Sequence, residues 1–231
     1  AVDGLGFETI KTITVDYAAG TTWPLPYSVD WSSAAEISDV AQVVDGRWSI
    51  VGGALRNDLL RYDRAVAIGD IAWTDYEVTV PITINGISSE ASGGVNGYPA
   101  VGVMLKWPGH SDWDGDQPTW GYYPSGGGGW YEFRNLGPGQ LSLRDFEGNF
   151  NDGDPLVRVL ALGTTYVWKV RVETQTDGSS LYRMKVWPEG SPEPSAWELS
   201  DTDTADVPGG SLLLIAHFAD VSFGDVIVEP L

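Results

Sequence analysis

The sequence predicts an all-β protein built as a single antiparallel β-sandwich, and three observations support this prediction. Short β-rich runs recur between turn clusters along the 231 residues. The 29 glycines and 14 prolines are scattered throughout the chain. No window of about 12 or more residues has a clean helical period. Regularly recurring short strands are typical of sandwiches and barrels, so we expect about eleven to thirteen strands and little helix.

The first 44 residues are expected to contribute one strand and an irregular approach to the main body. Residues 9–15 alternate and form a candidate first strand, and residues 16–33 are irregular. The best helix candidate is Ser33–Val44, although this segment is short enough to be an extended edge instead. No linker divides the chain. We therefore predict one domain over residues 1–231, with residues 1–44 packed on the rest.

The clearest strand is Tyr76–Ile84, in which apolar residues occupy every second position. This period of two is that of a half-buried strand. Pro81 falls on the polar face and removes one hydrogen-bond donor from the ladder. Because prolines within sheets are confined mainly to edges and bulges, we place this strand at an edge or a bulge.

The second half of the chain predicts a hairpin and a central strand. Thr165–Glu173 and Leu181–Trp187 alternate, and Asp177-Gly178 between them is a hairpin signal. Basic residues share the polar faces of these two strands, so cross-strand ion pairs on a solvated face are expected. The alternative is a cationic strip that binds an acidic polysaccharide. Leu212–Phe218 is nearly continuous in apolar residues, as expected for a strand covered on both sides.

The charge balance restricts the classes of partner. Lys and Arg number 13 against 32 Asp and Glu, which gives a formal net charge of −19. Such a chain repels nucleic acids and anionic membranes. No apolar run of about 18 residues could span a bilayer. Cysteine is absent, which excludes disulfides and thiolate metal sites. The N-terminus has no signal-peptide pattern, although one could have been removed, and we expect a secreted or cell-surface protein.

An aromatic insert between two predicted strands is the main candidate for a binding surface. The insert lies within residues 99–135 and holds four of the eleven tryptophans. Loops longer than about 12–15 residues are usually functional or disordered, and disordered loops are poor in aromatic residues. Sugar rings stack on Trp and Tyr, while Asp, Asn and His hydrogen-bond the hydroxyls. The candidate carbohydrate-binding residues are Trp107, His110, Trp113, Asp114, Asp116, Trp120, Tyr122, Tyr123, Trp130 and Arg134. The alternative is that several of these rings fill the open end of the sandwich.

A series of motifs over about residues 45–231 resembles a known fold family. They are Gly69-Asp70-x-x-Trp73-x-Asp75-Tyr76-Glu77, Val101-Gly102-Val103, Tyr166-x-Trp168-Lys169-x-Arg171, Tyr182-x-Met184-Lys185-x-Trp187, Glu193-Pro194-x-x-Trp197, Gly209-Gly210-Ser211-Leu212 and Phe223-Gly224-Asp225-Val226-x-Val228. Their order and spacing are similar to those of the concanavalin A-like, or laminin-G-like, jelly-roll domains of bacterial secreted proteins. The resemblance implies two antiparallel sheets, one of them curved, with a concave face and loops that commonly bind glycans.

The same resemblance, together with the acidic excess, points to a structural calcium ion. Asp225, at the start of the closing strand, is the ligand that the resemblance indicates. Asp112, Asp114 and Asp116 alternate as in a calcium loop, but Gly121 stands where that loop requires a glutamate. This segment is therefore no EF-hand, although an irregular Ca²⁺ site stays open.

The sequence carries no complete catalytic signature. Glycoside hydrolases of this fold carry a Glu-x-Asp-x-x-Glu strand motif, which is missing here. A polysaccharide lyase of this fold would need His, Tyr, Arg and usually Gln on the concave sheet, and the candidates are His217, Tyr131, Arg134 and Lys106. Only two histidines are present, which argues against a His-rich zinc site.

The sequence therefore favours a non-catalytic, lectin-like carbohydrate-binding module. A lyase or hydrolase with an unorthodox concave-face site is the first alternative, and a structural or adhesive domain that contacts protein is the second. The expected partner is a glycan or polysaccharide, with neither nucleic acid nor membrane. The chain is expected to be a monomer or part of a larger multidomain protein.

Overall fold

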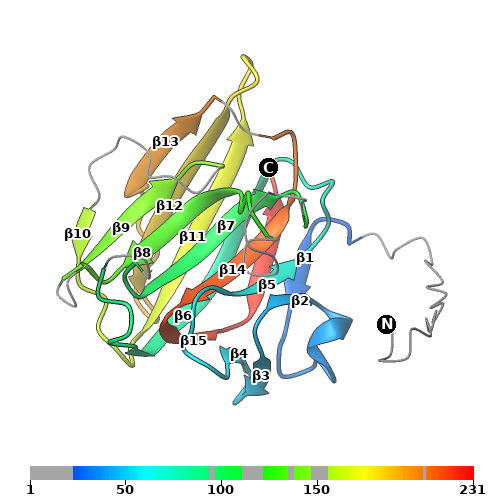
Figure 1. The fold of residues 1–231 in the computed structure, drawn as a ribbon. Coiled ribbons are helices and arrows are strands. Elements are labelled where there is room, and N and C mark those ends of the chain that lie inside the picture. The colour runs from blue at the N-terminus through cyan, green and yellow to red at the C-terminus, as the bar shows by residue number, and fades with distance from the viewer. Residues whose placement is uncertain (1–22, 94–96, 111–121, 135–137, 147–155, 205–206) are drawn as a thin grey trace, which may run out of the picture.

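Two antiparallel sheets pack face to face in the computed structural model (Figure 1), which describes residues 23–93, 97–110, 122–134, 138–146, 156–204 and 207–231. The seven-stranded sheet has the order β10 (Leu156–Arg158), β9 (Gly139–Arg144), β8 (Gly127–Glu132), β7 (Ala100–Trp107), β14 (Ser211–His217), β5 (Arg64–Ile68) and β2 (Gln42–Asp45). The predicted all-β antiparallel sandwich is confirmed.

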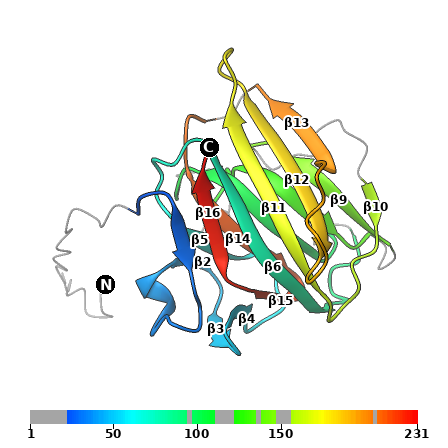
Figure 2. The same ribbon diagram turned by 180° about the vertical axis from the view of Figure 1, so that it is seen from behind.

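The nine-stranded sheet covers the other side of the sandwich and faces the viewer in Figure 2. Its main path is β13 (Leu199–Asp203), β12 (Ser180–Pro188), β11 (Thr165–Thr174), β6 (Tyr76–Ile87), β15 (Ala219–Phe223), β4 (Ala54–Asn57) and β3 (Trp48–Val51). The closing strand β16 (Val226–Pro230) pairs with β6 and with β1 (Tyr27–Val29). The described residues thus form sixteen strands, more than expected, because several edge strands have only three to five residues.

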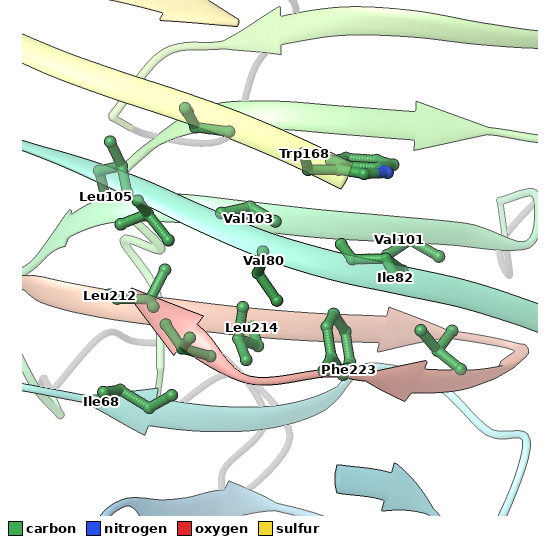
Figure 3. Packing of buried hydrophobic residues seen from close by; sticks show 14 of the residues in the cluster. Ile68, Val80, Ile82, Val101, Val103, Leu105, Trp168, Leu212, Leu214 and Phe223 are labelled. Carbon is green, nitrogen blue, oxygen red and sulfur yellow. The ribbon is translucent and has the colours of Figure 1, made fainter. Parts of the chain in front are cut away.

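The core lies between the two sheets and is formed by the inward-facing residues of both. Figure 3 shows Val80, Ile82 and Trp168 from the nine-stranded sheet against Val103 and Leu214 from the other. All five side chains are fully or almost fully buried. Burying such side chains stabilises the fold by about 1.5–3 kcal/mol each. The period of two in the sequence therefore determines which face of each strand enters the core.

Of the two alternatives predicted for Pro81, an edge or a bulge, the edge is wrong. Strand β6 lies inside the sheet and pairs with β11 on one side. On the other side it pairs with β16 through Thr79 and then with β15 from Ile82 onward. Pro81 stands between these two pairings, where Gly224 loops from one strand to the next and donates its N–H to the Pro81 carbonyl at 2.7 Å. The missing proline donor therefore falls at a break in the ladder.

The helix candidate Ser33–Val44 does not form an α-helix. Within Ser33–Val44, the described helix is a single 3₁₀ turn at Ile37–Asp39, and β2 then begins at Gln42. The alternative of an extended edge is the correct one for the end of this segment, because β2 pairs with β5. The candidate strand at residues 9–15 lies outside the described residues. No described helix is long and apolar enough to cross a membrane.

The predicted hairpin and its charged face are confirmed. Strands β11 and β12 pair over nine residue pairs across the Asp177-Gly178 turn. Lys169 lies opposite Lys185, and one acidic residue contacts both of these like charges. Glu193 binds Lys169 at 2.9 Å and Lys185 at 2.7 Å. The polar face of this sheet is therefore a cross-strand ion-pair network.

Acid should weaken the fold through hydrogen-bonded carboxylates such as Asp177. The Ser179 hydroxyl and amide donate to Asp177 at 2.6 and 3.0 Å, and these bonds lower its pKa. A folded-state pKa below the unfolded value gives stability that is present above the unfolded pKa and lost as pH falls through the folded one. We expect the urea midpoint to fall below about pH 4, with a shallower fall in Ser179→Ala. Identical pH profiles for the two proteins would contradict this assignment.

Candidate functional site

The outer face of the seven-stranded sheet carries small residues on which large side chains pack. Gly102 on β7 pairs with Trp130 on one side and Ile215 on the other. A Cβ atom at Gly102 would lie 2.6 Å from the Trp130 ring, so only glycine leaves room for this indole to lie over β7. Ala100, Ala65 and Ala67 on the same face are also small. Aromatic rings therefore pack directly on the sheet in a second apolar cluster, separate from the main core.

A buried carboxylate–imidazole pair lies at one end of this face. His217 ends β14, and its Nδ1 lies 2.6 Å from Oδ1 of Asp63. Two non-glycine residues have positive φ here: Asp63 of the pair at 23°, and Phe218, which follows His217, at 48°. Such conformations persist only where the surrounding structure enforces them, and they cluster at functional sites. The Phe218 N–H donates to the Arg61 carbonyl at 2.9 Å, which holds this turn in place.

Three tyrosines surround the pair. The Tyr122 hydroxyl donates to Oδ2 of Asp63, so the carboxylate bridges a phenol and an imidazole. Tyr123 lies against Tyr122 with ring centroids 5.0 Å apart. Tyr62 meets the His217 ring edge-on at 4.9 Å. Asp63 therefore fixes both its aromatic partners in position.

Two arginines and a glutamate adjoin these aromatic residues: Glu132 ends β8, Arg134 follows it, and Arg144 ends β9. The Arg144 guanidinium lies 4.0 Å above the centre of the Trp130 ring, a cation–π geometry. Glu132 contacts Arg134 at 2.8 Å and Arg144 at 3.6 Å. We call the whole set the His217 cluster, which consists of Tyr62, Asp63, Tyr122, Tyr123, Trp130, Glu132, Arg134, Arg144 and His217.

Burial keeps the tyrosines of the His217 cluster protonated. Burial first, and then the charge of Asp63, raise the pKa of Tyr123 to about 12. The same two causes raise the pKa values of Tyr62 and Tyr122 further. Burial lowers the pKa of Arg144, while nearby Tyr123 and Glu132 oppose that effect. Near neutral pH the phenols are therefore neutral hydrogen-bond donors.

Comparison with solved structures identifies the fold to which this architecture belongs. The chain superimposes on alginate lyase Aly36B in complex with an alginate trisaccharide with a TM-score of 0.54 and 15% identity, over 91% of this chain and 100% of that one. It also matches the Ca²⁺-bound exoplasmic/lumenal domain of VIP36 (TM-score 0.55, 10% identity, 88% and 90% coverage). The chain has the concanavalin A-like fold. The metal-free carbohydrate recognition domain of Emp46p matches too (TM-score 0.52, 7% identity, 90% and 98% coverage).

Identities this low show only the fold of this concanavalin A-like domain. No family model matches the sequence, and no curated protein matches it. These structures include a carbohydrate recognition domain as well as a lyase, so the assignment of activity depends on the site itself. The predicted resemblance to concanavalin A-like domains is confirmed at the level of the fold.

The candidate sugar-binding aromatic residues of the domain fall into buried and accessible groups. Trp107, Tyr122 and Trp130 are 2%, 2% and 6% exposed, and their rings pack in the second apolar cluster on the outer face of the sheet rather than at an open end of the sandwich. Tyr123 is half-buried, and His110 is exposed beside the Trp107 ring. The remaining candidates in the insert, Trp113, Asp114, Asp116 and Trp120, lie outside the described residues.

Two of the four candidate lyase residues, Tyr131 and Lys106, point away from the outer face of the seven-stranded sheet, where the His217 cluster lies. His217 and Arg134 belong to the His217 cluster, but Tyr131 points into the main core because it follows Trp130 on the same strand. Lys106 stands at an irregularity near the end of β7, with φ of 58°. Its Nζ donates inward to the Ser180 hydroxyl at 2.6 Å. Neither side chain can therefore act on a ligand at the outer face.

The described residues do not fit a calcium site at Asp225. Its Oδ1 accepts a hydrogen bond from the Trp31 amide at 3.1 Å, which ties β16 to the N-terminal segment. No group of three or more His, Asp or Glu residues that could hold a metal ion occurs in the part of the chain that the structure describes. Asp225 thus joins the terminal segments through a hydrogen bond from the Trp31 backbone.

Sequence reasoning missed Asp63, Tyr62 and Arg144. Tyr62 and Asp63 lie before β5 and are more than 150 residues away from His217 in the chain, so no local pattern joins them. Arg144 was detectable in principle, because the alternation of Leu141-Ser142-Leu143-Arg144 places Ser142 and Arg144 on the face opposite the buried leucines.

Proposed function

We propose that this domain is a non-catalytic, lectin-like module that binds a glycan at the outer face of the seven-stranded sheet. The contacts come from the accessible members of the His217 cluster, which are Tyr62, Tyr123 and Arg134. We further propose that it acts outside the cell or at the cell surface, as a monomer or as part of a larger protein. A net charge of −19 argues against nucleic acids as the alternative partner.

The observation that carries this proposal is the concentration of oriented polar groups on an aromatic floor. Asp63 fixes His217 and Tyr122, and Glu132 fixes Arg134 and Arg144. Neutral phenols, guanidinium groups and aromatic rings are the groups that bind sugar hydroxyls, carboxylates and apolar ring faces. Structural neighbours are described in complex with an alginate trisaccharide and with Man2. These features support a saccharide rather than a peptide ligand.

A glycan array with and without EDTA, followed by calorimetry, tests the binding proposal. Arg134→Ala should weaken binding about tenfold or more, because an interface arginine often anchors a ligand. Arg183→Ala is the matched control, since Arg183 lies on a different sheet and pairs with Glu173. Equal affinities in both variants, or no glycan hit for the parent protein, would contradict the proposal. Loss of binding in EDTA would point to an ion held by residues outside the described part.

A second candidate function is β-elimination on an acidic polysaccharide, and the His217–Asp63 pair favours it. In that reaction a base removes the proton beside the sugar carboxylate, the C–O bond to the leaving group breaks, and a C=C bond forms. In the tautomer whose Nδ1 donates to Asp63, Nε2 is the atom that would take the proton. A neutral tyrosine would protonate the leaving oxygen, and an arginine would neutralise the carboxylate.

The two candidate functions separate in one assay. A panel of uronate polysaccharides is incubated with the parent protein and with His217→Asn, and ultraviolet absorbance of the unsaturated product is followed. A lyase predicts absorbance that grows with time in the parent protein and falls at least about a hundredfold in the variant. Binding without product in either protein would leave the non-catalytic module and remove the lyase.

A further inference from the structure

A pocket lies at the end of the outer face away from the His217 cluster. It has a volume of about 1030 Å³ and lies where β5, β7 and β14 meet the edge strand β2. The residues that line it include Trp23, Gln42, Ile71, Trp107, His110 and Ser211. Ligand pockets usually measure about 300–1,000 Å³, so this one could hold several sugar units.

The pocket and the His217 cluster lie at opposite ends of strand β14 and are linked through Tyr122. Ser211 begins β14 at the pocket, and His217 ends the same strand in the cluster. At about 3.3 Å per residue, the two ends are roughly 20 Å apart. The Trp107 indole N–H donates to the Tyr122 carbonyl at 2.8 Å, and the Tyr122 hydroxyl donates to Asp63. Tyr122 thus connects the pocket floor to the cluster.

The chemistry of the pocket differs from that of the cluster. Among the described residues that line it, none is Asp, Glu, Lys or Arg. The floor includes the Trp107 ring, and His110 meets that ring edge-on at 5.4 Å. Ile71 is 63% exposed, and the exposed Gln42 adds an amide. The cluster, in contrast, carries two arginines and two carboxylates.

We propose that this pocket is a second subsite that binds an uncharged sugar unit of the same glycan chain. An uncharged sugar presents an apolar face to Trp23 and Ile71 and hydroxyls to Gln42, His110 and Ser211. A charged unit would lose hydration here without gaining an opposite charge, which is unfavourable. This inference rests on the proposed glycan-binding function and adds the substrate class of one end of the site.

The test occupies the pocket without disturbing the core. Gln42→Trp fills the opening from an exposed position on β2, and Ile71→Asp places a charge at the rim. Val157→Trp is the matched control, because Val157 is 62% exposed on β10, the opposite edge strand of the same sheet. Circular dichroism and melting temperature establish that all three variants fold. The probes are cellotetraose, mannotetraose, laminaritetraose and trimannuronate, measured by calorimetry and by NMR of the Gln42 side-chain amide.

A neutral tetrasaccharide should shift the Gln42 amide resonance of the parent protein. Its affinity should fall at least tenfold in Gln42→Trp and in Ile71→Asp and stay within about twofold in Val157→Trp. A parent protein that binds a probe while both pocket variants bind it equally well would overturn the subsite and leave the proposed function intact. If only trimannuronate shifted the Gln42 amide resonance, the proposal that the pocket binds an uncharged sugar would be overturned. Absence of binding by every probe would overturn both proposals.

Discussion

Replacing Trp168 by alanine should lower the free energy of unfolding by about 3–5 kcal/mol, the usual cost of deleting a large buried aromatic ring. Trp168 is fully buried on β11, between Val80 and Val186 on the neighbouring strands. Its ring faces the seven-stranded sheet across the core (Figure 3). The neighbours cannot close the resulting cavity because both sheets hold them in register. Urea unfolding followed by far-ultraviolet circular dichroism measures the loss.

The adjacent residue provides the control for this prediction. Val167 is only half-buried, because its side chain lies on the opposite face of the same strand. Val167→Ala should therefore cost less than about 1 kcal/mol. Equal losses for the two variants would show that strand propensity, rather than packing between the sheets, dominates the stability of β11.

Replacing Glu77 by alanine should cost about 3 kcal/mol, the second-largest effect that we expect. The Glu77 side chain is 8% exposed and lies 3.1 Å from the Lys169 ammonium. It also accepts a hydrogen bond from the Arg171 guanidinium at 2.8 Å. Its removal leaves two partly buried cations on one face of β11. The cost stays near the lower end for a broken buried pair, because Lys169 keeps Glu193.

Glu193 is the matched control for Glu77 because it binds the same lysine from a more exposed position. Its side chain is 44% exposed, against 8% for Glu77. Exposed ion pairs contribute about 0–1 kcal/mol, so Glu193→Ala should stay within that range. High salt should reduce the effect of Glu193→Ala more than that of Glu77→Ala. A larger loss of stability for Glu193→Ala than for Glu77→Ala would show that Glu193, rather than Glu77 on β6, contributes most to this network.

The strands that could be predicted are those whose burial alternates. Tyr76–Ile84, Thr165–Glu173 and Leu181–Trp187 all form strands with the predicted faces inward, because a period of two alone assigns each residue to a face. The short edge strands were harder to predict, since three or four residues carry little periodicity. The sequence left Pro81 at an edge or a bulge and could not predict its true pairing, because the strands that pair on this side of β6 lie far away in the chain.

The sequence by itself determined the fold class, the buried face of each long strand and the charged face of the β11–β12 hairpin. Those properties depend on local alternation, which needs no knowledge of distant partners. Only the tertiary structure decided that Asp63 meets His217 across more than 150 residues of chain, that glycine at position 102 admits the Trp130 ring, and that Lys106 turns inward. These contacts depend on strand order and register, which long-range packing selects and no short stretch of sequence encodes.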